Sequence, residues 1–389
     1  MKNLLIITTL LISTHSFAKL NIRGFGTAGV SVTDDNDALL RYKTGSKPDF
    51  SRLSKMGLNL TNELTNEYTF AAQLIAKDRV EDDKDFTLKE DWVFIKYQAS
   101  KNTSFRFGKL RLPIWLISDY LDVGYLYPWT ESPIEVYSQS SFNNGNGISA
   151  QHIFRFDSFD LKAELFFTNS NFTQEFTANT FGVGIAEDFT VMNVEANFEW
   201  LLLKATHAYA NDVKGNTFVS GGVPGTDARL KIPFDTKYKF TNIAIKIDKR
   251  GWEVYSEFAQ SGSNSSIQEA IFKAQYLTIG RRINKLFVYL SYNIYLYDFR
   301  KSYSVTSNSV TVTTPEYESN QNSIHFGTNY QLSSNTIFKV QVSKYSVDES
   351  NTYTIIAGAP QSDDLSTGSF AKNTGRDINV LNATLDFVF

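Results

Sequence analysis

The sequence predicts an all-β protein: a transmembrane antiparallel β-barrel of about 16 strands, with a long third loop folded into the lumen. Three observations lead to this prediction. Segments of roughly ten residues alternate apolar and polar side chains, short and long connections alternate between them, and the last segment ends on Phe389. A tilted strand crosses the bilayer in about 9–11 residues. Because lipid offers no hydrogen-bond partner, such strands require a closed sheet.

The first residues carry the pattern of a secretory signal peptide. Lys2 provides a positive start, residues 4–12 are mostly apolar, and Ala18 ends a small-residue cleavage pattern. The apolar run is shorter than the roughly 20 residues that a membrane-spanning helix requires. We therefore expect residues 1–18 to be removed and residues 19–389 to form one barrel domain. Loss of Lys2 changes the formal net charge from −3 to −4.

The composition agrees with a barrel and excludes several other classes. The chain is rich in Tyr (20) and Phe (31) and poor in Pro (8), and only every second residue of a barrel strand needs to be apolar. It contains no cysteine, which excludes disulfides and thiol chemistry. The small net charge argues against a nucleic-acid partner.

Sixteen alternating segments follow one another along the mature chain. They begin near residues 20, 54, 68, 92, 105, 148, 161, 188, 200, 238, 252, 270, 286, 323, 336 and 377. In the first segment Leu20, Ile22 and Val30 share one face, whereas Arg23 and Ser31 share the other. The apolar face is expected to meet lipid and the polar face to line the lumen. Bacterial barrels have even strand numbers, so about 14 or 18 strands are the alternatives.

The connections between these segments alternate in length. Short links fall at residues 61–65, 100–103, 157–160, 199, 248–251, 284 and 333–335. Long links fall at residues 33–51, 109–147, 211–236, 300–321 and 348–376. Tight turns on one side of a membrane and long loops on the other produce this asymmetry.

The C-terminal segment is the most specific single feature. Leu381, Ala383, Leu385, Phe387 and Phe389 alternate with polar or smaller residues, and Phe389 is the last residue. This pattern resembles the terminal strand that the barrel-assembly machinery recognises in outer-membrane proteins.

The connection at residues 109–147 has a composition that suits the inside of a barrel. It is rich in large apolar side chains such as Trp115, Tyr127 and Trp129, which would be costly on an exposed surface. We expect it to fold inward and narrow the lumen. An extracellular cap packed on neighbouring loops and a subunit-contact loop remain the alternatives.

Sixteen segments, a long third loop and a terminal Phe together resemble the general porin family of Gram-negative bacteria. Residues 116–137, LISDYLDVGYLYPWTESPIEVY, are also similar to a segment of uncharacterised porin-like proteins from gammaproteobacteria. The resemblance implies a water-filled channel for passive diffusion of ions and small polar solutes, with no catalysis and no cofactor. It also implies a homotrimer in the outer membrane, in contact with lipid and lipopolysaccharide.

In that family a basic wall faces the acidic third loop across the constriction. By alternation, the candidates for the basic wall are Arg23, Lys55, Arg106, Arg155 and Lys162, with Lys204 and Lys339 as further lumen-facing cations. The candidates on the loop are Asp119, Asp122, Glu131 and Glu135. Opposed charges set up a transverse field that orients dipolar solutes and tunes ion selectivity. The alternative for each cation is hydration of the lumen or pairing with an acid such as Glu164.

Two other functions remain open at this stage. Long polar loops at residues 211–236, 300–321 and 348–376 are compatible with a surface adhesin or receptor. A barrel enzyme of the phospholipase or protease type would need a catalytic group, and His152 is the histidine expected to face lipid. No residues stand at a spacing typical of a catalytic or metal site, so we expect neither.

Overall fold

A computed structural model describes residues 20–34, 39–40, 42–43, 47–78, 86–177, 180–219, 230–264, 269–299, 303–307, 310–314, 317–347, 355–357 and 377–389. The expected signal peptide, residues 1–18, lies outside the described residues, as do large parts of several long connections.

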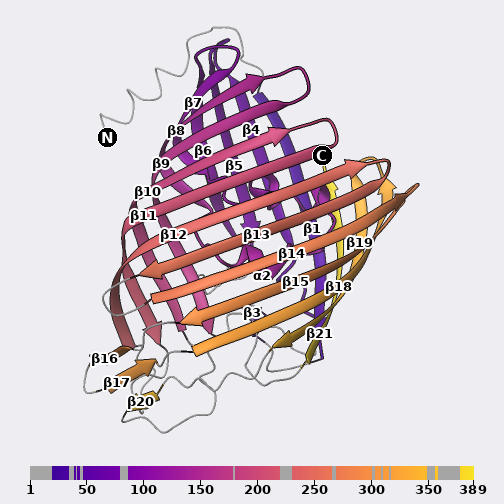
Figure 1. The fold of residues 1–389 in the computed structure, drawn as a ribbon. Coiled ribbons are helices and arrows are strands. Elements are labelled where there is room, and N and C mark those ends of the chain that lie inside the picture. Colours follow the sequence, from indigo (N-terminus) through magenta and orange to yellow (C-terminus); the bar gives the residue numbers. More distant parts are fainter. Residues whose placement is uncertain are drawn as a thin grey trace, which may run out of the picture.

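Sixteen strands form one closed antiparallel barrel (Figure 1). In the first half these are β1 (Leu20–Thr33), β4 (Lys55–Glu63), β5 (Tyr68–Lys77), β6 (Thr87–Gln98), β7 (Thr103–Arg111), β8 (Asn144–Arg155), β9 (Asp160–Thr177) and β10 (Thr180–Asn197). In the second half they are β11 (Leu201–Val219), β12 (Leu230–Lys249), β13 (Trp252–Asn264), β14 (Glu269–Ile283), β15 (Leu286–Phe299), β18 (Tyr317–Ser333), β19 (Thr336–Val347) and β21 (Asp377–Val388). The predicted strand number is confirmed.

Several strands are longer than the sequence pattern predicts. Strand β10 begins at Thr180 rather than near Asp188, and β12 begins at Leu230 rather than near Tyr238. These extensions pair with β11, for example Thr180 with Val219. The signal for these extensions is present in the sequence, since Leu230, Ile232 and Phe234 alternate with Lys231, Pro233 and Asp235 at the start of β12.

The inward and outward faces follow the predicted alternation. In β1, Leu20 and Ile22 are 53% and 56% exposed, whereas the inward Thr27 and Ser31 are 5% and 1% exposed. Large apolar side chains exposed on the outside of the wall are those that lipid would cover. The buried polar side chains therefore lie inside the barrel, where they can contact other polar groups.

The first and last strands close the barrel at a seam built around the chain end. Strand β1 pairs with β21, and the N–H of Gly24 donates to the carbonyl of Phe389 at 2.7 Å. The ring of Phe389 occupies the space beside Gly24, where a Cβ atom would lie only 2.1 Å from the ring. The ring of Phe387 lies over Gly26 in the same way. The terminal aromatic residue thus fills the seam that it closes.

Small elements accompany the barrel. Strands β16 (Tyr303–Ser307), β17 (Val310–Thr314) and β20 (Ile355–Ala357) form a three-stranded sheet beyond the end opposite the C-terminus, and β2 (Leu39–Leu40) pairs with β3 (Tyr42–Lys43) (Figure 1). Three short helices lie between β7 and β8: η1 (Ser118–Tyr120), η2 (Gly124–Leu126) and α2 (Ile134–Tyr137). None of the helices in the described part of the chain is long and apolar enough to cross a membrane.

We predict that Gly108→Ala destabilises the barrel by about 1–3 kcal/mol, the usual effect of overpacking. Gly108 has φ +138°, and a Cβ atom there would lie 2.3 Å from the carbonyl oxygen of Val93. Thermal unfolding of refolded protein in detergent measures the effect. Gly262→Ala is the matched control, because its added Cβ would have its nearest contact at 3.4 Å. Equal melting temperatures for the two variants would contradict the prediction.

Candidate functional site

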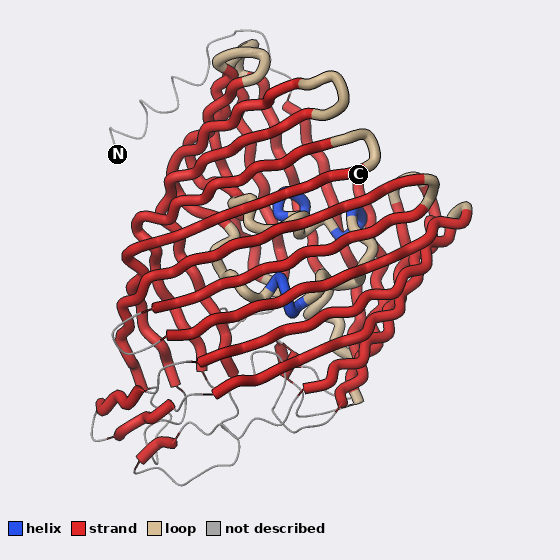
Figure 2. Tube along the Cα trace, in the orientation of Figure 1, coloured by secondary structure: helices blue, strands red, loops and turns tan. Residues whose placement is uncertain are grey.

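The segment between β7 and β8, residues 112–143, lies inside the barrel, and we call it the inner loop. Figure 2 shows its short helices within the cylinder of strands, about midway along it. Helix α2 packs against β13, β14 and β15, and η2 packs against β21. Leu112, Ile117 and Trp129 of the inner loop are completely buried. The inner loop therefore crosses the lumen and rests on the far wall.

A buried carboxylate on the far wall anchors the inner loop. Glu257 of β13 is 1% exposed and accepts the backbone N–H of Leu116 at 2.9 Å. It also accepts the hydroxyl of Tyr137 from α2. On the wall itself, the hydroxyl of Tyr276 donates to Glu257 at 2.8 Å, and the Nδ2 of Asn242 donates at 3.0 Å. Two of the four donors come from the loop, so Glu257 ties the loop to the wall.

Two buried lysines hold backbone carbonyls of the inner loop. The Nζ of Lys339 donates to the carbonyls of Gly124, Tyr127 and Trp129 at 2.5, 2.7 and 3.1 Å. The Nζ of Lys204 donates to the carbonyl of Trp115 at 2.5 Å. Both lysines were expected to face the lumen, and they do, but their charges bind the loop rather than open water. They supply donors to carbonyls of a largely irregular loop.

Aromatic side chains form the apolar contact between the inner loop and the wall. The ring of Trp115 packs edge-on against Phe240, with 4.9 Å between centroids. The ring of Trp129 packs in the same manner against Tyr255 and Tyr276. These arrangements are favoured by the aromatic quadrupole. The apolar residues that suggested an inward fold are thus buried in this interface.

Three of the four candidate acids of the inner loop are engaged with the wall strands or with the connection before β4. Asp122 pairs with Lys77 at 2.8 Å and with Arg111 at 2.5 Å. Glu131 pairs with Arg52 at 2.5 Å. Glu135 is fully buried and accepts hydrogen bonds from Gln321 and Ser323. Asp119, in η1, remains exposed and is the loop acid that faces open lumen.

Asp119 lies in the field of several cations. Enclosure within the barrel alone would raise the pKa of its carboxyl, but the charges of Lys204, Lys162 and Arg106 outweigh this effect and lower the pKa. Asp119 is therefore ionised at neutral pH. Arg106 and Lys162 also share Glu164, at 2.8 and 3.4 Å. Acidic and basic groups thus face each other across the space beside η1.

The structure separates the other predicted basic residues. Lys55 donates to the hydroxyl of Tyr127 at 3.2 Å, so it lies against the inner loop. Arg155 is the last residue of β8, and Arg23 is near the start of β1; both are exposed close to the end with short turns. The prediction that Arg23 and Arg155 belong to the constriction is therefore wrong. Alternation specifies the face of a strand but not the height along the barrel axis.

Sequence reasoning missed several charged residues of this region. Arg52, Lys77 and Arg111 pair with loop or wall acids, and Lys96 of β6 faces Arg106 of β7 directly. The alternation that identified Arg106 also places Lys77 and Lys96 on the inward face. That signal was present in the sequence, but it does not show which inward cations come near the loop.

Among the described residues, the histidines form no recognisable catalytic arrangement. The outward His152 shares a hydrogen bond of 2.8 Å with the hydroxyl of Thr103. His325 contacts the hydroxyl of Ser323 at 2.8 Å, but both side chains are 1% exposed beneath α2. A substrate cannot reach them there. Within the described ranges, no group of three or more His, Cys, Asp or Glu residues could hold a metal ion.

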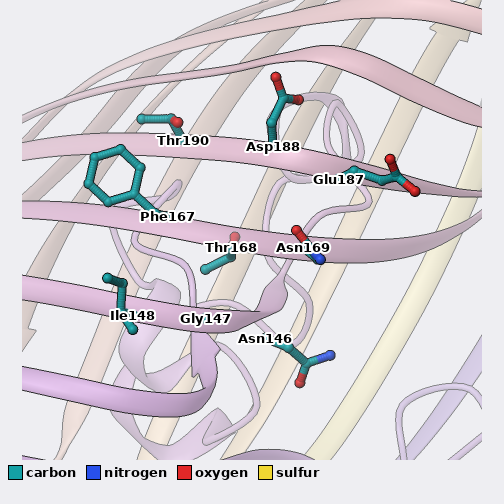
Figure 3. A pocket seen from close by; sticks show the side chains of 9 residues that line it. All are labelled: Asn146, Gly147, Ile148, Phe167, Thr168, Asn169, Glu187, Asp188 and Thr190. Carbon is teal, nitrogen blue, oxygen red and sulfur yellow. The ribbon is translucent and has the colours of Figure 1, made fainter.

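A shallow hollow lies on the outer surface of the wall, apart from the lumen. It is lined by Asn146, Gly147, Ile148, Phe167, Thr168, Asn169, Glu187, Asp188 and Thr190 (Figure 3). Strand β10 changes register here, and Asp188 accepts the backbone N–H of Asn211 at 3.1 Å. Ile148 and Phe167 are about half exposed on the same surface. Asp188 therefore stabilises an irregularity of the wall.

No protein-family model and no curated protein matches the sequence. The fold matches solved structures over nearly their full length. OmpT, an outer membrane protein of Vibrio cholerae, is 13% identical with a TM-score of 0.59, and the match covers 97% of this chain and 99% of that chain. The anion-selective porin from Comamonas acidovorans is 12% identical with a TM-score of 0.56, covering 95% and 99%. The outer membrane channel DcaP of Acinetobacter baumannii is 10% identical with a TM-score of 0.55, covering 97% and 99%. The chain therefore has the fold of outer-membrane β-barrel proteins.

We predict that Glu257→Ala releases the inner loop. The substitution leaves buried donors from Leu116, Tyr137, Tyr276 and Asn242 without their acceptor, and each such donor costs about 1–3 kcal/mol. Chymotrypsin should then cut within residues 112–143, which the wild-type fold protects.

Glu253→Ala is the matched control for this experiment. Glu253 lies on the same strand, but its partners are Tyr255 and Arg282 rather than the inner loop. Equal resistance of both variants to chymotrypsin would show that Glu257 does not anchor the loop.

Proposed function

We propose that the protein is a porin: a water-filled channel through which ions and small polar solutes diffuse passively across the outer membrane. The observation that carries this proposal is a closed barrel of sixteen strands with polar inward faces, crossed by an inner loop whose exposed Asp119 lies in the electrostatic field of Lys204, Lys162 and Arg106. A barrel of this size encloses more space than its own wall side chains fill. The proposal requires no catalysis and no cofactor.

The charges beside η1 support a selective constriction. A negative group on the loop and positive groups on the wall produce a field across the path of a solute. Dipolar and charged solutes orient in such a field, whereas apolar solutes gain nothing from it. The loop also leaves less of the lumen open, which limits the size of what passes.

The names of two structurally similar proteins support this function. One is an anion-selective porin and another an outer membrane channel. OmpT of Vibrio cholerae is also known in a trimer form, with a TM-score of 0.57 to this chain. We extend the proposal to a homotrimer whose remaining outer surface contacts lipid and lipopolysaccharide. Conductance that rises in groups of three equal steps would support the trimer.

A surface-receptor role is the second candidate. It is favoured by the pairing of β17 with both β16 and β20, which joins two long connections into one sheet. Loss of binding to cells or phage on deletion of β20, with conductance unchanged, would favour this role as an addition to the pore.

The test of the pore is single-channel current of refolded protein in a planar bilayer under a potassium chloride gradient. We expect steady conductance, and its absence would overturn the proposal. We further predict that Asp119→Asn shifts the reversal potential toward chloride. The change in permeability ratio should reach at most about fivefold, since a unit charge acting over about 4 Å of water contributes about 1 kcal/mol.

Glu187→Gln is the control for Asp119→Asn, because it removes the same charge from the outer surface of the wall. It should leave the reversal potential unchanged. The difference between the two variants should shrink in concentrated salt, which screens the charge. Identical reversal potentials at low salt would exclude Asp119 from the conducting path.

A further inference from the structure

Strand β6 presents an apolar and a charged surface side by side to the lumen. Trp92, Phe94 and Lys96 alternate along its inward face, and each keeps part of its surface exposed. On the neighbouring β7, Arg106 stands directly opposite Lys96 in the strand register. Two aromatic rings and two cations thus occupy a short stretch of the same wall.

The cations Lys96 and Arg106 are not fully neutralised by nearby acids. Arg106 pairs with Glu164 at 2.8 Å, and Lys162 contacts Glu164 and Glu195, both at 3.4 Å. The charged neighbour that acts on Lys96 is Arg106, which repels it. Like charges directly opposite each other on adjacent strands are unfavourable. An anion placed between Lys96 and Arg106 would remove this repulsion.

The local balance of charge indicates a single negative charge on the ligand. The ion pairs of this wall region join the cations Arg106 and Lys162 to the acids Glu164 and Glu195, and Lys96 stands opposite Arg106 as a third cation. Three positive groups against two negative groups leave one positive charge. The unmatched charge is on the side of Lys96, away from the acids that Lys162 and Arg106 share.

The aromatic side of this surface consists of Trp92 and Phe94, which are partly buried and keep some ring surface exposed. The rings of Trp92 and Phe94 lie 5.4 Å apart between centroids, and the guanidinium of Arg106 lies 5.9 Å from the Phe94 ring centre. Gly108 stands opposite Phe94 in the register and has no side chain to cover that ring. Planar groups stack on aromatic and guanidinium faces with favourable energy.

We propose that Trp92, Phe94, Lys96 and Arg106 form a binding subsite for small aromatic monocarboxylates within the lumen. The carboxylate binds between Lys96 and Arg106, and the ring of the ligand lies against Phe94 and Trp92. The inference deepens the proposed pore function, because the subsite would favour one class of solute among those that pass.

The test is equilibrium dialysis of radiolabelled benzoate against the full chain refolded in detergent, with empty micelles as the blank. Acetate and benzyl alcohol serve as competitors that carry only the charge or only the ring. We expect benzoate to bind more tightly than either competitor. Lys96→Gln should weaken benzoate about tenfold, the scale of one lost charge-assisted hydrogen bond.

Two matched variants separate the contributions. Arg155→Gln removes one positive charge near the short turns, away from the subsite, and should leave benzoate binding unchanged. Phe94→Leu should weaken benzoate several-fold and leave acetate unaffected. Equal losses in Lys96→Gln and Arg155→Gln, or equal binding of acetate and benzoate, would overturn the proposal in favour of a general attraction for anions.

Dialysis also separates failure of the subsite from failure of the pore. Binding of benzoate by a protein that conducts no current would support the subsite and overturn the pore. Steady conductance without specific benzoate binding would support the pore and overturn the subsite.

Discussion

Backbone hydrogen bonding in a layer without water is the constraint on which the rest of this structure depends. Lipid offers neither donors nor acceptors, so every strand needs a partner on both sides and the sheet must close on itself. Closure is completed where β21 meets β1, and Phe389 and Gly24 exchange both of their backbone hydrogen bonds. Only then do the alternating side chains divide between lipid and lumen, and the polar inward face becomes a surface on which a site can form.

The same constraint explains how the inner loop is held. Irregular backbone at membrane depth is tolerated only where protein or water satisfies its polar groups. Lys339 and Lys204 supply donors to loop carbonyls, and Glu257 accepts a loop N–H. These contacts are charged and directional, whereas the aromatic packing around Trp115 and Trp129 is not. The aromatic residues therefore keep the loop inside the barrel, and the buried charges determine its position.

This arrangement divides the inward charges into two groups. Arg52, Arg111 and Lys339 form ion pairs or hydrogen bonds with the inner loop. Their charges therefore contribute little to the electric field in the open lumen. Arg106 and Lys96 retain exposed surface on the opposite wall. The electrostatic character of the lumen is therefore decided by which charges the inner loop leaves uncovered, and not by the total number of charges on the inward faces.

The sequence by itself predicted about sixteen strands and the face of each side chain, because a period of two is a local property of every strand. It also indicated an inner loop, since residues such as Trp115 need a buried environment. It did not determine height along the barrel, so Arg155 and Arg106 share a face yet lie at different levels. It also did not distinguish Asp119, which stays exposed, from Glu135, which is buried against Gln321. Only the tertiary structure decided these points, because strand stagger and the path of the inner loop bring together residues that are far apart in the chain.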